Sequence, residues 1–197
     1  MLSDAHAMNT VTNSLPDVLI SSAFGPLNPL EPRRIRGLFA QNLYADPIEI
    51  EAPITTVWAI MTDFDRYPEW NPLNRFFRLD SKAQPNHFVT FGPSWGPYDR
   101  TEGEPFSGPD MTQREMITIW EENRCLAYAD IRLLIKAERV QYISAVEDGK
   151  TRYSTYERIA GLLSPLVKRH FGSRIIAGFT ANGMALKRRA ESLAGNV

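Results

Sequence analysis

Three ionisable residues occupy β-rich segments in which alternation predicts an inward-facing side chain. His87 has the parity of the apolar residues Val89 and Phe91, so the three point to one face of a strand. Asp130 and Glu157 likewise alternate with apolar and aromatic neighbours. Imidazole exchanges a proton near neutral pH, and burial raises the pKa of a carboxyl group toward that range. These residues are therefore candidate catalysts for acid/base chemistry without a metal.

Each of the three residues also has a plain structural explanation. A strand carboxylate near Arg or Lys is commonly an exposed cross-strand pair, and Arg132 shares the parity of Asp130. A shift of one residue in strand register would turn all three side chains to the opposite face. Both alternatives stay open at this point.

Aromatic residues in the same segments could line an apolar cavity beside the ionisable groups, and tyrosine hydroxyls could orient carbonyl oxygens there. Ordinary core packing is the alternative for each of them. The candidates for ligand binding are Tyr67, Trp70, Phe77, Phe88, Phe91, Trp95, Tyr128, Tyr142, Tyr153 and Phe179.

Other kinds of chemistry find little support in the residues. The histidines His6, His87 and His170 lie far apart, without the spacing of paired zinc ligands. The sequence has neither a glycine-rich phosphate loop after a strand nor a serine nucleophile elbow. Cys125 is the single cysteine, so an internal disulfide is impossible and a reducing compartment is expected. We expect neither a cofactor nor a metal.

Composition limits the class of protein. A chain of 22.3 kDa can bury one full core, which favours one compact domain with an extension. The net charge of −1 argues against a nucleic-acid partner. No apolar run is long enough for a membrane span or a signal peptide, so a cytoplasmic protein without stable membrane insertion is expected. We predict an N-terminal extension, a partly ordered arm, over 1–45 and the domain over 46–197.

The elements that must position these residues follow from hydrophobic periodicity. Alternation at 46–51 predicts a strand, and a three-and-four spacing over 57–64 predicts a helix, followed by a short second helix. Helical periodicity from Pro165 predicts a terminal helix of about 28 residues. Its glycines Gly172, Gly178 and Gly183 indicate a close approach of other backbone or a bend. Between these parts lie six β-rich segments, at 73–79, 87–91, 112–120, 125–134, 135–146 and 151–159.

A stretch rich in glycine and proline separates Phe91 from Met111. It is too long for a tight hairpin and predicts an extended loop. Its aromatic residues Trp95, Tyr98 and Phe106 could cap a cavity mouth, or could simply pack on the surface.

The order of strand, two short helices, six strands and long helix is that of the helix-grip fold. Three segments carry a family likeness: IEIEAP at 48–53, DFDRYPEWNP at 63–72 and ERIAGLL at 157–163. They resemble the polyketide cyclase/dehydratase and lipid-transport (SRPBCC) branch of the START-like, Bet v 1-like superfamily. The resemblance implies an α+β fold, in which a seven-stranded bent antiparallel sheet wraps around the long C-terminal helix and encloses an apolar cavity.

The resemblance implies two functions for that cavity. One is cofactor-independent cyclisation or dehydration of a hydrophobic, oxygenated small molecule such as a polyketide, which we favour slightly. Enolisation and loss of water both need proton transfer between groups held close together. The other is non-catalytic binding and carriage of a lipid-like or aromatic ligand. A protein-interaction module that uses the N-terminal arm, as in a homodimer, is a third interpretation.

Overall fold

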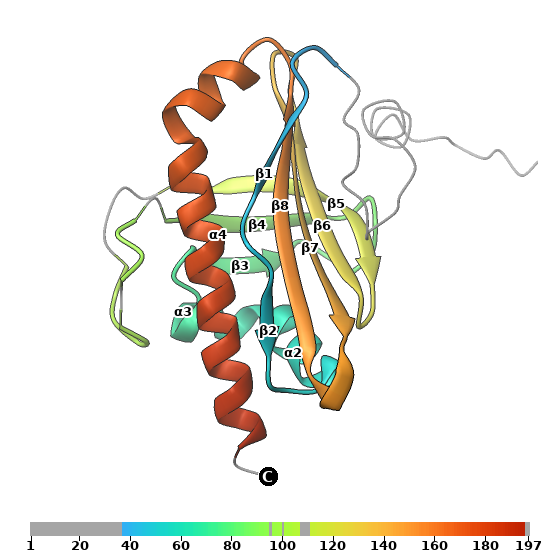
Figure 1. Cartoon of the computed structure of the whole chain (residues 1–197). Coiled ribbons are helices and arrows are strands. Elements are labelled where there is room, and N and C mark those ends of the chain that lie inside the picture. The colour runs from blue at the N-terminus through green and yellow to red at the C-terminus, as the bar shows by residue number, and fades with distance from the viewer. Residues whose placement is uncertain (1–36, 95, 100, 107–110, 196–197) are drawn as a thin grey trace, which may run out of the picture.

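One bent antiparallel sheet and one long helix make up most of the protein (Figure 1). The computed structural model describes residues 37–94, 96–99, 101–106 and 111–195. The strands are β1 (Gln41–Tyr44), β2 (Ile48–Ile50), β3 (Asn74–Leu79), β4 (Phe88–Pro93), β5 (Gln113–Glu121), β6 (Cys125–Ile131), β7 (Lys136–Ala145) and β8 (Thr151–Ala160). The helices are α2 (Ile54–Thr62), α3 (Tyr67–Trp70) and α4 (Ser164–Ala194), with short 3-10 turns η1 (Phe64–Arg66) and η2 (Glu147–Gly149).

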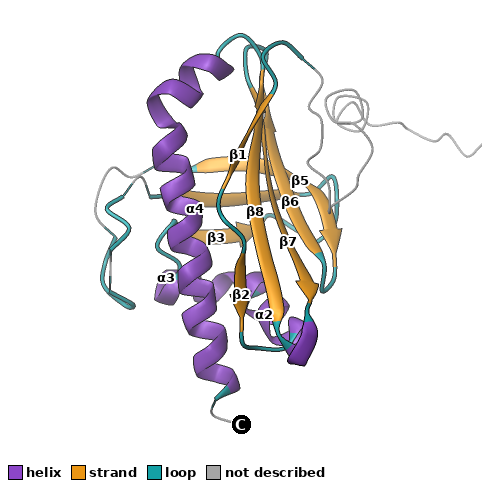
Figure 2. Cartoon of the chain, in the orientation of Figure 1, coloured by secondary structure: helices purple, strands orange, loops and turns teal. Residues whose placement is uncertain are grey.

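The sheet has the order β1-β8-β7-β6-β5-β4-β3, and β2 pairs with the remaining half of β8. Figure 2 shows α4 lying across one face of this sheet, with α2 and α3 closing one end. The predicted helix-grip architecture is thereby confirmed, with eight strands in place of seven. The extra strand, β1, has a single buried residue, Leu43, so no alternation marks it in the sequence.

The start of the sheet also corrects the expected domain boundary. β1 pairs with Tyr156–Ile159 of β8, so the domain includes residues from Gln41 onward and does not begin at 46. Residues 1–36 of the predicted arm lie outside the described residues.

Helix α4 begins with Ser164 and Pro165, as the sequence predicts, and runs for 31 residues. Its glycines allow close approach, although the neighbouring atoms belong to side chains and not to backbone. A Cβ atom on Gly178 would lie 2.8 Å from Leu73 Cδ1, and one on Gly183 would lie 3.2 Å from Ile48 Cδ1. Within the described part of the chain, no helix is both long and apolar enough to cross a membrane.

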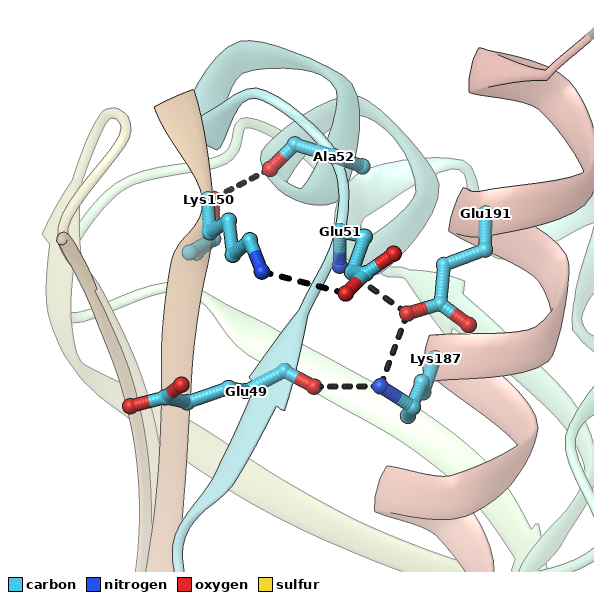
Figure 3. Close-up of polar contacts among 7 residues, drawn as sticks. Glu49, Glu51, Ala52, Lys150, Lys187 and Glu191 are labelled. Atoms are coloured by element: carbon cyan, nitrogen blue, oxygen red, sulfur yellow. Dashed lines mark hydrogen bonds and ion pairs between the residues drawn. The ribbon is translucent and has the colours of Figure 1, made fainter. Parts of the chain in front are cut away.

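Polar contacts fix the C-terminal half of α4 to the edge of the sheet (Figure 3). Lys187 Nζ donates to the carbonyl oxygen of Glu49 at 2.6 Å and pairs with Glu191 at 2.7 Å. Glu191 Oε1 in turn accepts the backbone N–H of Glu51 at 2.9 Å. Because these contacts involve backbone groups of the β2 region, they set the position of α4 on the sheet at this end.

The connection from β8 to α4 depends on Gly161. Its φ of +119° is a conformation that side chains disfavour, and an added Cβ would lie 2.4 Å from the carbonyl oxygen of Leu134. We expect Gly161→Ala to lower the free energy of unfolding by about 2–3 kcal/mol, measured by urea denaturation. Gly149→Ala is the control, because Gly149 also has a positive φ but nothing within 4 Å. Equal losses in both variants would show that the contact with Leu134 is unimportant.

Candidate ligand-binding cavity

A cavity of about 190 Å³ lies between the N-terminal half of α4 and the inner face of the sheet. Here α4 contributes only Ile175 and Phe179 to the wall, so the helix does not fill the curve of the sheet. The other apolar lining residues are Leu73, Phe91, Pro93, Ile135 and Ala137, and the polar ones are Asn74, Ser94, Tyr98, Gln113, Glu115, Tyr128, Asp130, Arg139 and Glu157.

Strand register brings three of the polar groups side by side. Glu157 on β8 pairs with Arg139 on β7, which pairs with Tyr128 on β6. Asp130 follows two residues after Tyr128, on the same face of β6. Glu115 lies on β5, two residues before Ile117, the partner of Tyr128. The polar wall of the cavity is therefore built by four adjacent strands.

Arg139 is the buried cation of this wall. Its Nη1 donates to Tyr128 Oη at 3.2 Å and its Nη2 donates to Asn182 Oδ1 of α4 at 2.7 Å. Its guanidinium carbon lies 4.4 Å from the centre of the Phe179 ring. Among the described residues no carboxylate lies within ion-pair distance of it, and its Nε finds no hydrogen-bond partner there. An anionic or carbonyl oxygen of a ligand would complete its coordination.

Two carboxyl groups of the wall, those of Glu157 and Glu115, are shifted toward the neutral form. Burial raises the pKa of Glu157 to about 7, although the positive charge of Arg139 opposes the shift. Burial, together with the charges of Glu157 and Asp130, raises the pKa of Glu115 well above its ordinary value. Burial also raises the pKa of Tyr128 to about 12, so its hydroxyl stays a donor. Glu157 can therefore take or give a proton near neutral pH.

Five of the predicted catalytic and ligand-binding residues line the cavity: Asp130, Glu157, Phe91, Tyr128 and Phe179. Asp130 also forms a partly exposed ion pair with Arg132 at 2.7 Å, two residues along the same segment and not across two strands as the alternative had it. The catalytic roles of Asp130 and Glu157 stay predictions.

Four of the predicted ligand-binding aromatics, Tyr67, Trp70, Phe77 and Tyr153, belong instead to the packed core between the sheet and the helices. Phe77 stacks on Phe91 of the neighbouring strand with ring centres 5.3 Å apart, and it does not line the cavity. Tyr67 Oη donates to a backbone carbonyl at 2.6 Å, and Tyr153 Oη to Gln141 at 3.0 Å. These rings support the cavity wall without lining it.

His87, Phe88 and Tyr142 are wrongly predicted to face the cavity. His87 precedes the first residue of β4, and its ring is hydrogen-bonded by Ser81 Oγ and by Gln84 Nε2 in the turn. Phe88 lies under the guanidinium of Arg114, 3.8 Å from its carbon, and Tyr142 packs against the cluster of Cys125 and Tyr156 on the other face. Trp95 lies outside the described residues.

The long loop predicted after Phe91 contains no helix or strand among its described residues 94, 96–99, 101–106 and 111–112. Tyr98 of this loop lines the cavity, and its Oη lies 2.9 Å from the position that a Cβ on Gly178 would take. The backbone N–H of Gly103 donates to the carbonyl oxygen of Glu69 at 3.0 Å, which ties the loop to α3. Its role as a lid stays a prediction.

Sequence reasoning missed Glu115 and Arg139. Arg139 has the parity of the buried Ile143, which was a usable signal, but it stands beside Glu138 and alternation could not separate the two faces. Asn71, in contrast, is the structural turn residue that the sequence indicates: its Oδ1 accepts the backbone N–H groups of Leu73 and Asn74 at 2.9 and 3.2 Å. In the described ranges, no three His, Cys, Asp or Glu side chains group as metal ligands.

Comparisons with known proteins bear on the fold. No family model and no curated protein matches the sequence. The di-domain ARO/CYC StfQ of the steffimycin biosynthetic pathway matches with a TM-score of 0.59 and 15% identity, over 79% of this chain and 52% of that one. The chain thus spans about half the length of StfQ.

Two single-domain structures match over most of their length. A START superfamily protein from Mycobacterium smegmatis has a TM-score of 0.54 and 18% identity, over 78% of this chain and 98% of that one. The Zhui aromatase/cyclase from a Streptomyces species has a TM-score of 0.51 and 13% identity, over 76% and 95%. The chain therefore has the START-like, polyketide cyclase-like fold that the sequence motifs indicate.

Proposed function

We propose that this START-like chain binds a hydrophobic, oxygenated small molecule in the α4 cavity and catalyses its cyclisation or dehydration without a cofactor. One observation carries the proposal: a partly buried carboxyl group with a pKa of about 7, Glu157, stands opposite a buried guanidinium, Arg139, in a cavity that also offers apolar surface. The aromatase/cyclase names of two fold relatives support the same reading of the site.

Different parts of the cavity wall bind different parts of the proposed ligand. Leu73, Ile135 and Ile175 offer apolar surface to a carbon skeleton, and burial of that skeleton supplies most of the binding free energy. Arg139 and Tyr128 offer N–H and O–H donors to carbonyl oxygens. A poly-carbonyl molecule meets both requirements.

The proposed reaction begins when the Glu157 carboxylate removes a proton from a carbon beside a carbonyl group. The electrons of that C–H bond move to the carbonyl oxygen, and the resulting enolate is stabilised by Arg139 and Tyr128. The enolate carbon then attacks a second carbonyl carbon, so a C–C bond forms and the second oxygen becomes an alkoxide. Protonated Glu157 returns its proton to that alkoxide, which yields a hydroxyl group.

Dehydration follows in a second cycle, with Glu157 as the base and Glu115 as the acid. The Glu157 carboxylate removes a proton beside the new carbinol carbon, the C–O bond breaks, and the departing hydroxide takes a proton from Glu115 to leave as water. Glu157 then releases its proton to solvent and Glu115 takes one up, which restores both groups. Glu115 suits the role of the acid because its raised pKa keeps its proton to a higher pH than an ordinary carboxyl group does.

Carriage without chemistry is the second candidate function. The observation that favours it is the apolar surface next to the cavity: Ile135 of the wall directly follows the exposed residues Leu133 and Leu134. A mass-spectrometric assay separates the two functions. A short poly-β-ketone thioester that loses water only in the presence of the protein supports catalysis, whereas binding without turnover supports carriage.

Filling the cavity tests the binding site itself. Ala137→Phe places a ring in the space, so we expect the affinity for the fluorescent probe anilinonaphthalene sulfonate to fall at least about tenfold. Ala145→Phe is the matched control, because it adds the same ring at an exposed position of the same strand. Undiminished binding of the probe by Ala137→Phe would show that ligands bind elsewhere.

A further inference from the structure

Exposed apolar side chains gather at one end of the molecule. Eleven large apolar residues are exposed in the described part of the chain. Seven of them come from three segments that meet at this end, so these residues are clustered and not spread singly over the surface. The segments are the approach to β1, the β6–β7 turn and the β8–α4 connection, which lie together at the end opposite the C-terminus (Figure 1). We call this set the apolar tip: Leu38, Phe39, Leu133, Leu134, Leu162, Leu163 and Leu166.

The apolar tip is a built surface. The backbone N–H of Gly161 donates to the carbonyl oxygen of Leu38 at 2.8 Å, and that of Leu163 donates to Leu134 at 3.2 Å. Ser164 Oγ donates to the carbonyl oxygen of Phe39 at 2.7 Å. These bonds join the three segments, so their side chains are held outward, and Leu133 is 95% exposed. A contiguous exposed patch of this kind marks a binding surface.

Charge identifies the partner. The three segments together with the adjoining strand ends and the start of α4, residues 37–43, 131–137 and 160–171, contain Arg132, Lys136, Lys168 and Arg169 but no Asp or Glu, although the whole chain has a net charge of −1. Arg132 pairs with Asp130 of the cavity rim, whereas Lys168 and Arg169 are exposed at the start of α4. Leucines beside lysine and arginine complement a partner that has an apolar interior under a layer of negatively charged groups.

We infer that the apolar tip docks the protein on an anionic phospholipid bilayer, with its leucines among the acyl chains and with Lys168 and Arg169 at the headgroup phosphates. The tip consists of turns and the first helical turn at one end of the molecule (Figure 1). Such protruding residues enter a bilayer surface without any span. Ile135 of the cavity wall directly follows the tip residue Leu134, so the docked end of the molecule is next to the cavity. The inference is independent of the proposed catalysis.

Vesicle co-sedimentation tests the inference with the full chain. We expect tight binding to vesicles of phosphatidylcholine mixed with phosphatidylserine, weaker binding to phosphatidylcholine alone, and weakening by salt. Leu133→Ser combined with Leu166→Ser should lower the affinity at least about tenfold, because the free energy of transferring two leucine side chains from water to the acyl chains is lost. Lys168→Glu combined with Arg169→Glu should lower it at least about tenfold on the anionic vesicles alone.

The matched control replaces two exposed apolar residues in the other half of the same helix, Met184→Ser with Leu193→Ser, and should leave vesicle binding unchanged. Thermal unfolding of each variant verifies that the fold is intact. Absence of binding by the wild type, or equal loss in tip and control variants, would overturn the inference. So would a dimer, detected by analytical ultracentrifugation, that the tip variants convert to monomer without any change in vesicle binding.

Discussion

Glu157→Gln is expected to slow turnover of a poly-β-ketone probe by about 10²–10⁴-fold while the affinity for anilinonaphthalene sulfonate changes less than about twofold. Glutamine has nearly the shape of glutamate but cannot accept the proton. In the wild type the rate should rise as the pH rises through about 7, because the reactive form is the carboxylate. A variant that retains the full rate would remove Glu157 from the mechanism.

The same substitution should stabilise the protein at alkaline pH. The pKa of Glu157 rises from 4.5 to about 7 on folding, so between these values the native state binds more protons than the unfolded state. Stability conferred by the protonated carboxyl group is therefore complete below 4.5 and is lost, by about 3 kcal/mol, as the pH rises through about 7. Urea denaturation well above pH 7 should show Glu157→Gln to be the more stable protein, whereas the exposed control Glu147→Gln should match the wild type.

Arg139→Met is expected to weaken binding of the anionic probe by about 10–100-fold, because hydrogen bonds to a charged group contribute about 1.5–3 kcal/mol. Methionine keeps an apolar chain of similar reach beside Phe179 but removes the donors and the charge. The pKa of Glu157 should rise further, since the opposing positive charge is gone, and the pH at which turnover begins should move upward.

This shift of the pH profile separates a role in the site from a role in packing. A residue that merely fills the core would change stability without moving the profile, and that result would contradict the assignment. Arg139→Lys should restore much of the profile but not the affinity, since lysine keeps the charge without the planar fork of donors. Arg152→Met, at an exposed ion pair with Glu49 on the same sheet, should leave both measurements unchanged.

Site residues were predicted correctly inside regular strands, and wrongly where a strand ends. Asp130 and Glu157 line the cavity because β6 and β8 pair without interruption through or next to these residues, so parity was a sound guide. His87 has the correct parity, but β4 begins one residue later and turn contacts hold its ring. Parity applies only inside a strand, and periodicity locates the ends of strands poorly.

The sequence pattern also did not show which helix covers each part of the sheet, and therefore which inward-facing residues reach the cavity. Phe77 and Phe91 face the same way and stack on each other, yet only Phe91 reaches the cavity. The difference arises because α2 and α3 pack over one end of the sheet and leave the other to α4. Likewise, the bond from Arg139 to Asn182 joins residues 43 positions apart, and no local pattern contains it. The overall fold needed only local periodicity and motif, which is why it was predictable.

Glu157, Arg139 and Tyr128 are aligned across three neighbouring strands, so polar groups stand at regular intervals along the cavity wall. Neighbouring strands are spaced about 4.8 Å apart, so an elongated guest lying crosswise meets one polar group at each step. Selection among guests would then depend on the intervals between their oxygen atoms more than on their bulk. Molecules of equal size but different oxygen pattern should be told apart by the pitch of the sheet.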